Sequence, residues 1–270
     1  MAGPKVLEIL QLFTANAPRW RVDRIADHMQ VSTSTAYRCV AELVRAGFLQ
    51  PVSGGAYVLG PAFTEFDLRM RQSDPLLRAA GPHMRKLHAL LGQQTTTVLA
   101  RYYRDCVMFA HIERGRDAPA SHGRGQNISL FGPAAMARAV LFALPDRVLR
   151  GLYQNHAAEI AATGLGNDQR EFRAHIKALR ERGWAFARAV VVAGRVGIGA
   201  PVICDGIVRG SMGVSLPEPI DDGEIERVGR IVMQQAELVG AELSRDAPDV
   251  PRLLGRRRGV ASERVIPALQ

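Results

Sequence analysis

Hydroxyl, phenol and guanidinium groups gather in one short stretch of the sequence, residues 33–38. Hydroxyl groups can bond phosphates or base edges, and the guanidinium of Arg38 can bond either one through charge-assisted hydrogen bonds. If the stretch begins a helix, its exposed side chains lie where a helix in the major groove meets the base edges. The candidate DNA contacts in this stretch are Thr33, Ser34, Thr35, Tyr37 and Arg38.

For these side chains to reach DNA, the segments around them must form a helix-turn-helix. Apolar residues recur at helical spacing in three segments, residues 5–13, 22–29 and 33–46. Residues 30–32 are short enough for a tight connection, and Ser32 or Thr33 can cap the helix that follows. Gly47 suits the left-handed position that ends a helix. The pattern therefore predicts three helices, of which the third carries the candidate contacts.

Two short β runs, residues 48–52 and 56–59, follow the third helix and flank a Ser-Gly-Gly turn at 53–55. Three helices and a β-hairpin predict a winged helix-turn-helix. The turn carries no charge, so Ser53 is the candidate side-chain contact from the wing. On periodicity alone, a plain three-helix core whose hydroxyls merely cap a helix stays open as the alternative.

The next predicted helix carries a single apolar stripe of Phe63, Phe66 and Met70. A stripe this narrow favours a helix–helix contact between two copies of the chain, and packing on its own domain is the alternative. Ser73-Asp74-Pro75 follows as the best domain boundary. We therefore predict a DNA-binding domain over 1–62, a connector over 63–74, a larger domain over 75–246 and a basic, mobile tail over 247–270.

The larger domain alternates between predicted helices and strands. Helices are predicted over residues 77–91, 134–142 and 169–181 and again after Asp222. Strands are predicted over residues 95–100, 106–112, 184–192, 195–204 and 207–215. This order predicts an α+β domain in which helices flank an antiparallel sheet.

Composition is that of a folded, soluble protein with room for two domains. The 270 residues are 47% hydrophobic and 23% charged, which excludes a disordered or fibrous chain. The net charge of +9 suits a polyanionic partner, because each phosphate neutralised by Arg or Lys releases counterions. Part of that charge lies in the C-terminal arginines, so the charge alone is weak support for nucleic-acid binding.

Neither a membrane segment nor a metal motif is evident. Glu8 interrupts the apolar N-terminal stretch and Arg195 interrupts the most apolar later one, so we predict a cytoplasmic protein without a membrane partner. Cys39, Cys106 and Cys204 are far apart and in no metal-binding or redox spacing. The sequence therefore predicts no metal site and no cofactor.

Several segments match a known pattern. They are Arg24-Ile25-Ala26, residues 31–38, Ala46-Gly47-Phe48-Leu49 and Tyr57-Val58-Leu59-Gly60, and more thinly residues 137–141, Gly183-Trp184-Ala185 and Ala200-Pro201-Val202. Together they resemble the IclR family of bacterial transcription regulators. The resemblance implies a GAF-like effector-binding domain, a double-stranded DNA operator, and homodimers or tetramers. It also implies control of a catabolic operon, often by an aromatic or organic acid.

By position, the resemblance also implies where an effector would bind. The implied pocket residues are Phe131, Met136, Val140, Gly197 and Ser215. The sequence departs from the family here, because residues 187–190 lack the usual acidic stretch, Gly197 replaces a cysteine, and Gly213 replaces the first of two serines. Ser215 can bond a carboxylate, and the lost acidic residues near Arg188 would otherwise repel an anion. Both features favour a small organic or aromatic acid.

Two other functions stay open. One is a DNA-binding, oligomeric regulator whose C-terminal domain binds no ligand. The other is an enzyme, which is less favoured because the sequence has no Gly-x-Ser-x-Gly elbow, phosphate-binding loop or His-Glu-x-x-His helix. His83 and His88 are five positions apart and do not share a helix face well. We therefore predict no catalytic residues.

Overall fold

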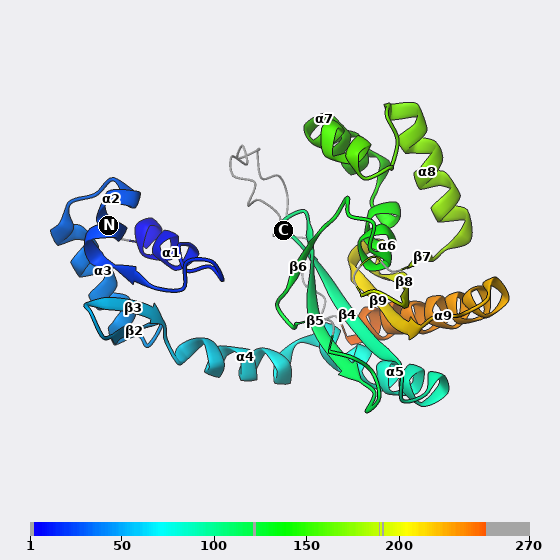
Figure 1. The fold of residues 1–270 in the computed structure, drawn as a ribbon, viewed down its shortest axis with the longest axis horizontal. Helices are drawn as coiled ribbons and strands as arrows, with labels where there is room; N and C mark the ends of the chain where they lie inside the picture. The colour runs from blue at the N-terminus through cyan, green and yellow to red at the C-terminus, as the bar shows by residue number, and fades with distance from the viewer. Residues whose placement is uncertain (1–2, 121–122, 189, 191, 247–270) are drawn as a thin grey trace. The chain divides into compact units, whose positions relative to one another are not determined.

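The chain divides into two units, residues 1–74 and 75–270 (Figure 1). The computed structural model describes residues 3–120, 123–188, 190 and 192–246. The predicted mobile tail at 247–270 lies outside the described residues. Among the residues that are described, no helix is both long and apolar enough to cross a membrane.

The first unit packs three helices around one apolar core. They are α1 (Gly3–Gln11), α2 (Val22–Met29) and α3 (Thr33–Arg45). Ile9, Ile25 and Val40 are fully buried at their centre. The first helix ends two residues earlier than predicted, and just beyond its end the indole Nε1 of Trp20 donates to the carbonyl oxygen of Leu12 at 2.9 Å. Apolar periodicity continues through that turn, so it could not show the end of the helix.

A small antiparallel sheet completes the winged helix-turn-helix, and its fold class is as predicted. Strands β2 (Leu49–Val52) and β3 (Ala56–Leu59) form the wing. Strand β1 (Trp20–Arg21) was not predicted and pairs with the other edge of β3. Two residues are too few to show an alternating pattern. Helix α4 (Ala62–Ser73) follows the wing in the same unit.

The second unit is built on a six-stranded antiparallel sheet with the order β6-β5-β4-β9-β8-β7. Its strands are β4 (Thr96–Tyr103), β5 (Cys106–Arg114), β6 (Asn127–Ser129), β7 (Ala185–Arg188), β8 (Arg195–Cys204) and β9 (Ile207–Pro217). Strand β6 was not predicted. The strand predicted over 184–192 was too long, because Val190 and Val192 line a cavity instead of extending β7.

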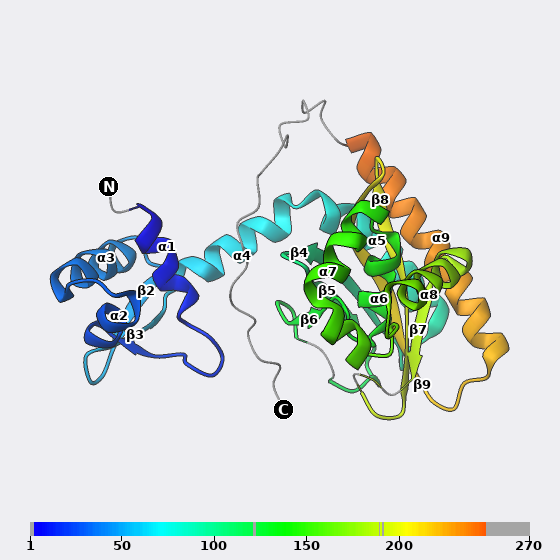
Figure 2. The same cartoon turned by 90° about the horizontal axis from the view of Figure 1, so that it is seen from above.

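Helices cover both faces of this sheet, as predicted (Figures 1 and 2). One face is covered by α5 (Pro75–Leu91) and α9 (Asp222–Asp246), and the other by α6 (Ala135–Ala143), α7 (Asp146–Ala162) and α8 (Gln169–Arg182). The sequence did not predict α7. Non-helical backbone at His156 interrupts it between the buried residues Leu152 and Ile160, so no single apolar stripe runs along it.

Gly229 on α9 lies against the indole ring of Trp184, which is 2% exposed. A Cβ atom at Gly229 would lie 2.3 Å from Cε2 of Trp184. Alanine normally stabilises a helix by about 1 kcal/mol relative to glycine. Because the ring already fills the space, we expect Gly229→Ala to destabilise the protein by about 1–3 kcal/mol instead.

Gly151→Ala is the matched control, because Gly151 lies in α7 and a Cβ there would have no neighbour within 4 Å. It is expected to stabilise the protein by about 0.5–1 kcal/mol. Urea unfolding of both variants measures the two changes. Stabilisation by Gly229→Ala would show that Trp184 can move away without loss.

Candidate DNA-binding and ligand-binding sites

The start of α3 is fixed by a cap made from its own hydroxyl groups. The Oγ of Ser32 accepts a hydrogen bond from the backbone N–H of Thr35 at 3.3 Å. The same oxygen lies 2.9 Å from Oγ1 of Thr35 and 3.1 Å from Oγ of Ser34. Two of the predicted DNA contacts therefore also belong to the cap, which holds their hydroxyls in place.

The remaining predicted contacts on α3 face solvent. Cys39 and Val40 are buried toward the core, whereas Thr33 and Arg38 are exposed and Tyr37 is 57% exposed. Within the described part of the chain, the guanidinium of Arg38 forms no hydrogen bond or ion pair. The exposed side of α3 therefore presents a phenol and an unpaired cation, which can bond base edges or phosphates.

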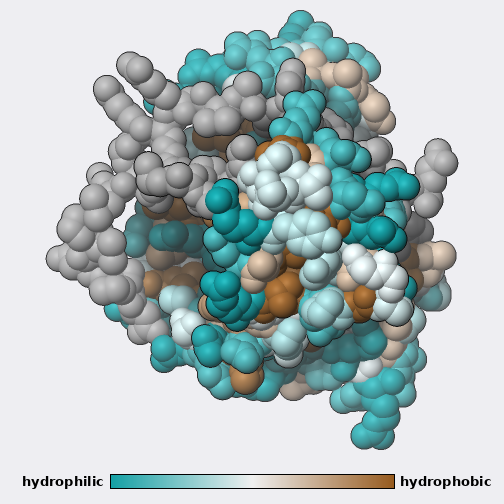
Figure 3. All heavy atoms as spheres, turned by 90° about the vertical axis from the view of Figure 1, so that its left-hand side faces the viewer, coloured by the Kyte–Doolittle hydropathy of each residue, from teal (hydrophilic) through white to brown (hydrophobic). Residues whose placement is uncertain are grey.

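The wing tip is exposed, and a cation that the sequence did not point to lies beside it. Nη1 of Arg21 donates to the carbonyl oxygen of Gly54 at 3.2 Å, next to the exposed Ser53. Arg21 reaches the tip because β1 pairs with β3. Figure 3 shows one face of the molecule as largely hydrophilic, with hydrophobic residues in small groups. The wing thus has a basic neighbour that its turn sequence lacks.

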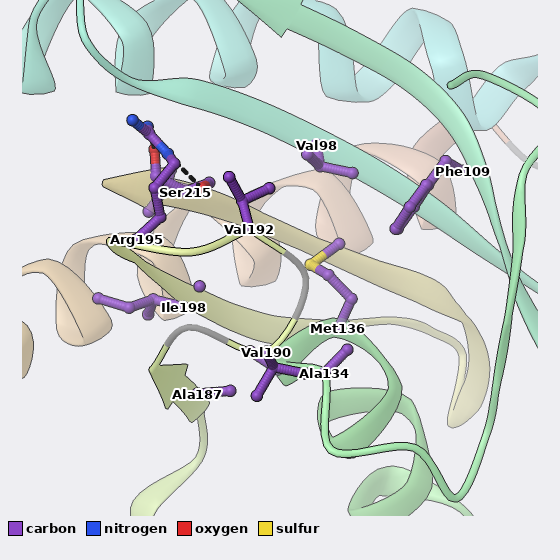
Figure 4. Close-up of a pocket in the computed structure, with 13 residues that line it drawn as sticks. Val98, Phe109, Ala134, Met136, Ala187, Val190, Val192, Arg195, Ile198 and Ser215 are labelled. Atoms are coloured by element: carbon purple, nitrogen blue, oxygen red, sulfur yellow. Dashed lines mark hydrogen bonds between the residues drawn. The ribbon is translucent and has the colours of Figure 1, made fainter. Parts of the chain in front are cut away.

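A cavity lies in the second unit between α6 and the face of the sheet that α6 covers (Figure 4). Its apolar wall includes Val98, Phe109, Ala135, Met136, Val190 and Val192. Arg195 and Ser215 provide its polar groups. The cavity volume is about 40 Å³, within about 500 Å³ of empty space that includes open solvent, so the walls must move apart to admit even a small molecule.

Three of the five pocket residues implied by the family resemblance border this cavity, namely Met136, Gly197 and Ser215. Phe131 and Val140 do not border it. The ring of Phe131 packs 4.9 Å from the ring of His156, measured between centroids, and Val140 is fully buried in the core on that side of the sheet. Val140 lies about one helical turn beyond Met136, which carries it past the cavity.

Paired glycines let α6 approach the sheet closely. Gly199 on β8 lies opposite Gly213 on β9. A Cβ atom at Gly213 would lie 2.6 Å from Sδ of Met136, and one at Gly199 would lie 3.0 Å from it. The thioether therefore fills the space above both glycines, which gives the departure from serine at Gly213 a structural reason. The Oγ of Ser211 donates to the carbonyl oxygen of Met136 at 2.9 Å and fixes the helix there.

Arg195 is the main cavity residue that sequence reasoning missed. It is 6% exposed, and its Nε donates to Oγ of Ser215 at 2.9 Å (Figure 4). Its Nη2 donates to the carbonyl oxygens of Gln94 at 2.6 Å and of Ser215 at 2.5 Å. Burial lowers the pKa of the Arg195 guanidinium, although arginine stays protonated in proteins. The signal in the sequence that could have pointed to Arg195 is its position as the charged residue inside the apolar stretch 189–203.

No carboxylate balances this charge within the described residues, since none lies within ion-pair distance of Arg195. Arg188, by contrast, does not border the cavity and is paired with Glu218 at 3.2 Å and Asp222 at 2.9 Å. The hydrogen bond to Glu218, and then the one to Asp222, raise the pKa of Arg188. The cation that could attract an anion into the cavity is therefore Arg195 and not Arg188.

The described residues contain no group of three His, Cys, Asp or Glu side chains that could hold a metal ion.

A winged helix-turn-helix with an exposed polar helix, followed by a separate unit that contains a cavity, defines a class of DNA-binding transcription regulators. The family model for the IclR helix-turn-helix domain matches residues 5–53. The model for the bacterial transcriptional regulator IclR C-terminal domain matches residues 69–237. The chain belongs to the IclR family of transcriptional regulators, which are not enzymes.

Solved structures share this fold. An IclR regulator from Alicyclobacillus acidocaldarius is 19% identical, with a TM-score of 0.71 over 90% of this chain and 98% of that one. An IclR homologue from Microbacterium hydrocarbonoxydans, complexed with 4-hydroxybenzoate, is 19% identical, with a TM-score of 0.68 over 91% and 100%. HmgR from Pseudomonas aeruginosa is also 19% identical, with a TM-score of 0.64 over 87% and 96%. No curated protein matches the sequence.

Proposed function

We propose that the chain controls a catabolic operon in response to a small organic acid, with aromatic acids as the first class to test. The observation that carries the proposal is the Arg195–Ser215 pair at an otherwise apolar cavity. Because Arg195 donates to Oγ of Ser215, the hydroxyl keeps its own proton for a ligand acceptor. An unbalanced cation beside that hydroxyl favours an anionic ligand.

The apolar wall supports an acid with a compact hydrophobic body. Val98, Phe109 and Met136 offer no hydrogen-bonding group toward the cavity beyond a weak thioether acceptor, so a polar chain would lose its hydration there. A single ring with one carboxylate combines the two properties that the lining requires. The structure from Microbacterium hydrocarbonoxydans, which holds such a compound, supports aromatic acids as the starting point.

On the DNA side, we propose that the operator is bound by the residues predicted from the sequence, joined by Arg21. They are Thr33, Ser34, Thr35, Tyr37, Arg38 and Ser53. We also propose the domain limits at 1–62 and 75–246, with the connector over 63–74 between them. For an acid to regulate this binding, its affinity must differ between the free and the DNA-bound protein.

Calorimetric titration of benzoate, 4-hydroxybenzoate and short aliphatic acids tests the proposal, using the protein alone and bound to DNA selected from a random pool. Linkage requires that an acid which weakens DNA binding also binds the complex more weakly, by the same factor. Binding by none of the acids would contradict the proposed effector class. It would favour the alternative in which the second domain only assembles the protein.

We further propose that the chain forms a homodimer through α4. Phe63 and Phe66 pack against Phe48 of the same unit, with ring centroids 5.3 and 5.6 Å apart. Even so, 46% of Phe66 and 52% of Met70 stay exposed. Packing on its own domain thus accounts for only part of the stripe, and a second copy would cover the rest.

We expect light scattering at micromolar concentration to give twice the chain mass, and Met70→Asp to reduce that mass because it places a charge in the apolar contact. Gln72→Asp is the matched control, since Gln72 is exposed on the same helix but off the stripe. A monomer mass for the parent protein would exclude this dimer.

A further inference from the structure

The hydroxyl of Thr96 is fully buried and, within the described residues, has no hydrogen-bond partner. Buried hydroxyl groups are nearly always hydrogen-bonded, because a lost bond to water that is not replaced costs free energy. Its two neighbours follow that rule: Oγ1 of Thr95 donates to Leu91, and Oγ1 of Thr97 donates to Glu113. The exception at Thr96 therefore calls for a functional reason.

The strand register places Thr96 next to the proposed effector site. Thr96 on β4 lies directly opposite Ser215 on β9, and Ser215 lies opposite Gly197 on β8. Directly opposed residues of antiparallel strands point to the same face, with Cβ atoms about 4.5–5.5 Å apart. Val98, two residues along β4, borders the cavity, so Thr96 faces the same side of the sheet. Thr96 does not itself line the cavity, but its strand partner Ser215 does, so its hydroxyl lies one residue behind the cavity wall.

Arg195 reaches the same corner. Its guanidinium bonds Ser215 and also the carbonyl oxygen of Gln94, only two residues before Thr96. The side chain thus extends from β8 past β9 to the beginning of β4. The hydroxyls of Thr96 on β4 and Ser215 on β9 can each donate a proton, and both lie near the buried guanidinium of Arg195.

We propose that Thr96 and Ser215 together hold the carboxylate of the effector, each hydroxyl donating to one carboxylate oxygen while Arg195 balances the charge. This inference rests on the proposed function and adds a second donor that distinguishes acids from their neutral analogues. A carboxylate offers two equivalent acceptors, whereas a primary amide offers one acceptor and an amino group. The site therefore binds benzoate in preference to benzamide.

The test is Thr96→Val, which keeps the shape of the side chain and removes its hydroxyl. We expect benzoate binding, measured by calorimetry, to weaken about tenfold, because one charge-assisted hydrogen bond is lost. We also expect the melting temperature of the ligand-free variant to rise, because the buried, unpartnered hydroxyl is gone. Lower affinity together with higher stability is a combination that a purely structural role would not produce.

Thr96→Ser should restore benzoate binding to within about twofold of the parent protein, since it returns the hydroxyl. Thr97→Val is the matched control on the opposite face and should leave benzoate affinity unchanged. If the parent protein and Thr96→Val bind benzoate equally well, the proposed role of Thr96 in holding the carboxylate is overturned, while the proposed function stands. If the parent protein binds no acid of the panel, both fail.

Discussion

A Met136→Trp variant is expected to show no binding of benzoate or 4-hydroxybenzoate at concentrations about 100-fold above the dissociation constant of the parent protein. The side chain of Met136 extends from α6 over Gly199 and Gly213 and borders the cavity. An indole is much larger than the methionine side chain, and the sheet below it leaves no room. The ring would therefore occupy the space of the ligand. Isothermal titration calorimetry measures the loss directly.

Because a larger side chain in a packed region can also disturb folding, two further variants accompany this one. Met136→Leu keeps the volume nearly constant and should bind like the parent protein. Gly197→Val enters the cavity from the opposite wall, where a Cβ would meet only Ala135 at 3.8 Å and Ala187 at 3.9 Å, both ordinary contacts. It should fold normally and bind weakly. Full binding by both folded, enlarged variants would place the effector elsewhere.

An Arg38→Ala variant is expected to bind operator DNA about 5- to 150-fold more weakly, which corresponds to about 1–3 kcal/mol for one base-reading contact. The guanidinium has no partner in the described structure, so its removal should leave the free energy of unfolding unchanged. Thr35→Ala should weaken DNA binding in the same range. It should also cost a little stability, because Thr35 belongs to the cap of α3.

Fluorescence anisotropy on DNA selected by the parent protein measures both affinities, and Arg45→Ala is the matched control. The Arg45→Ala substitution also removes one positive charge from α3, but from its last turn, away from the predicted DNA contacts at the start of the helix. A salt titration separates two roles of Arg38. If Arg38 contacts a phosphate, its loss lowers the slope of log affinity against log salt concentration by about one and weakens binding to all DNA sequences alike. If Arg38 contacts a base, its loss instead reduces the preference for one base at one position of the operator. Unchanged footprints for Arg38→Ala and Thr35→Ala would exclude α3 as the reading helix.

The predicted elements that match best are those whose signals are local. Helix α2 and the start of α3 follow from apolar periodicity and from Ser32, whose side chain does cap the helix. Helix α7 was missed because a kink at His156 interrupts its pattern. Strands β1 and β6 were missed because two or three residues cannot show alternation. Local rules thus succeed where several residues repeat one geometry and fail where a single residue breaks it.

For the DNA-binding region, the sequence by itself determined nearly everything proposed, since the candidate contacts lie within one helix and one turn. The cavity is different. Arg195 and Gln94 are 101 positions apart and meet only because β8, β9 and β4 are neighbours in the sheet. The partnerless hydroxyl of Thr96 likewise became visible only from the strand register and from burial. Periodicity tells which side of an element is buried, but strand order decides which buried residues share a cavity, and that order comes from long-range packing.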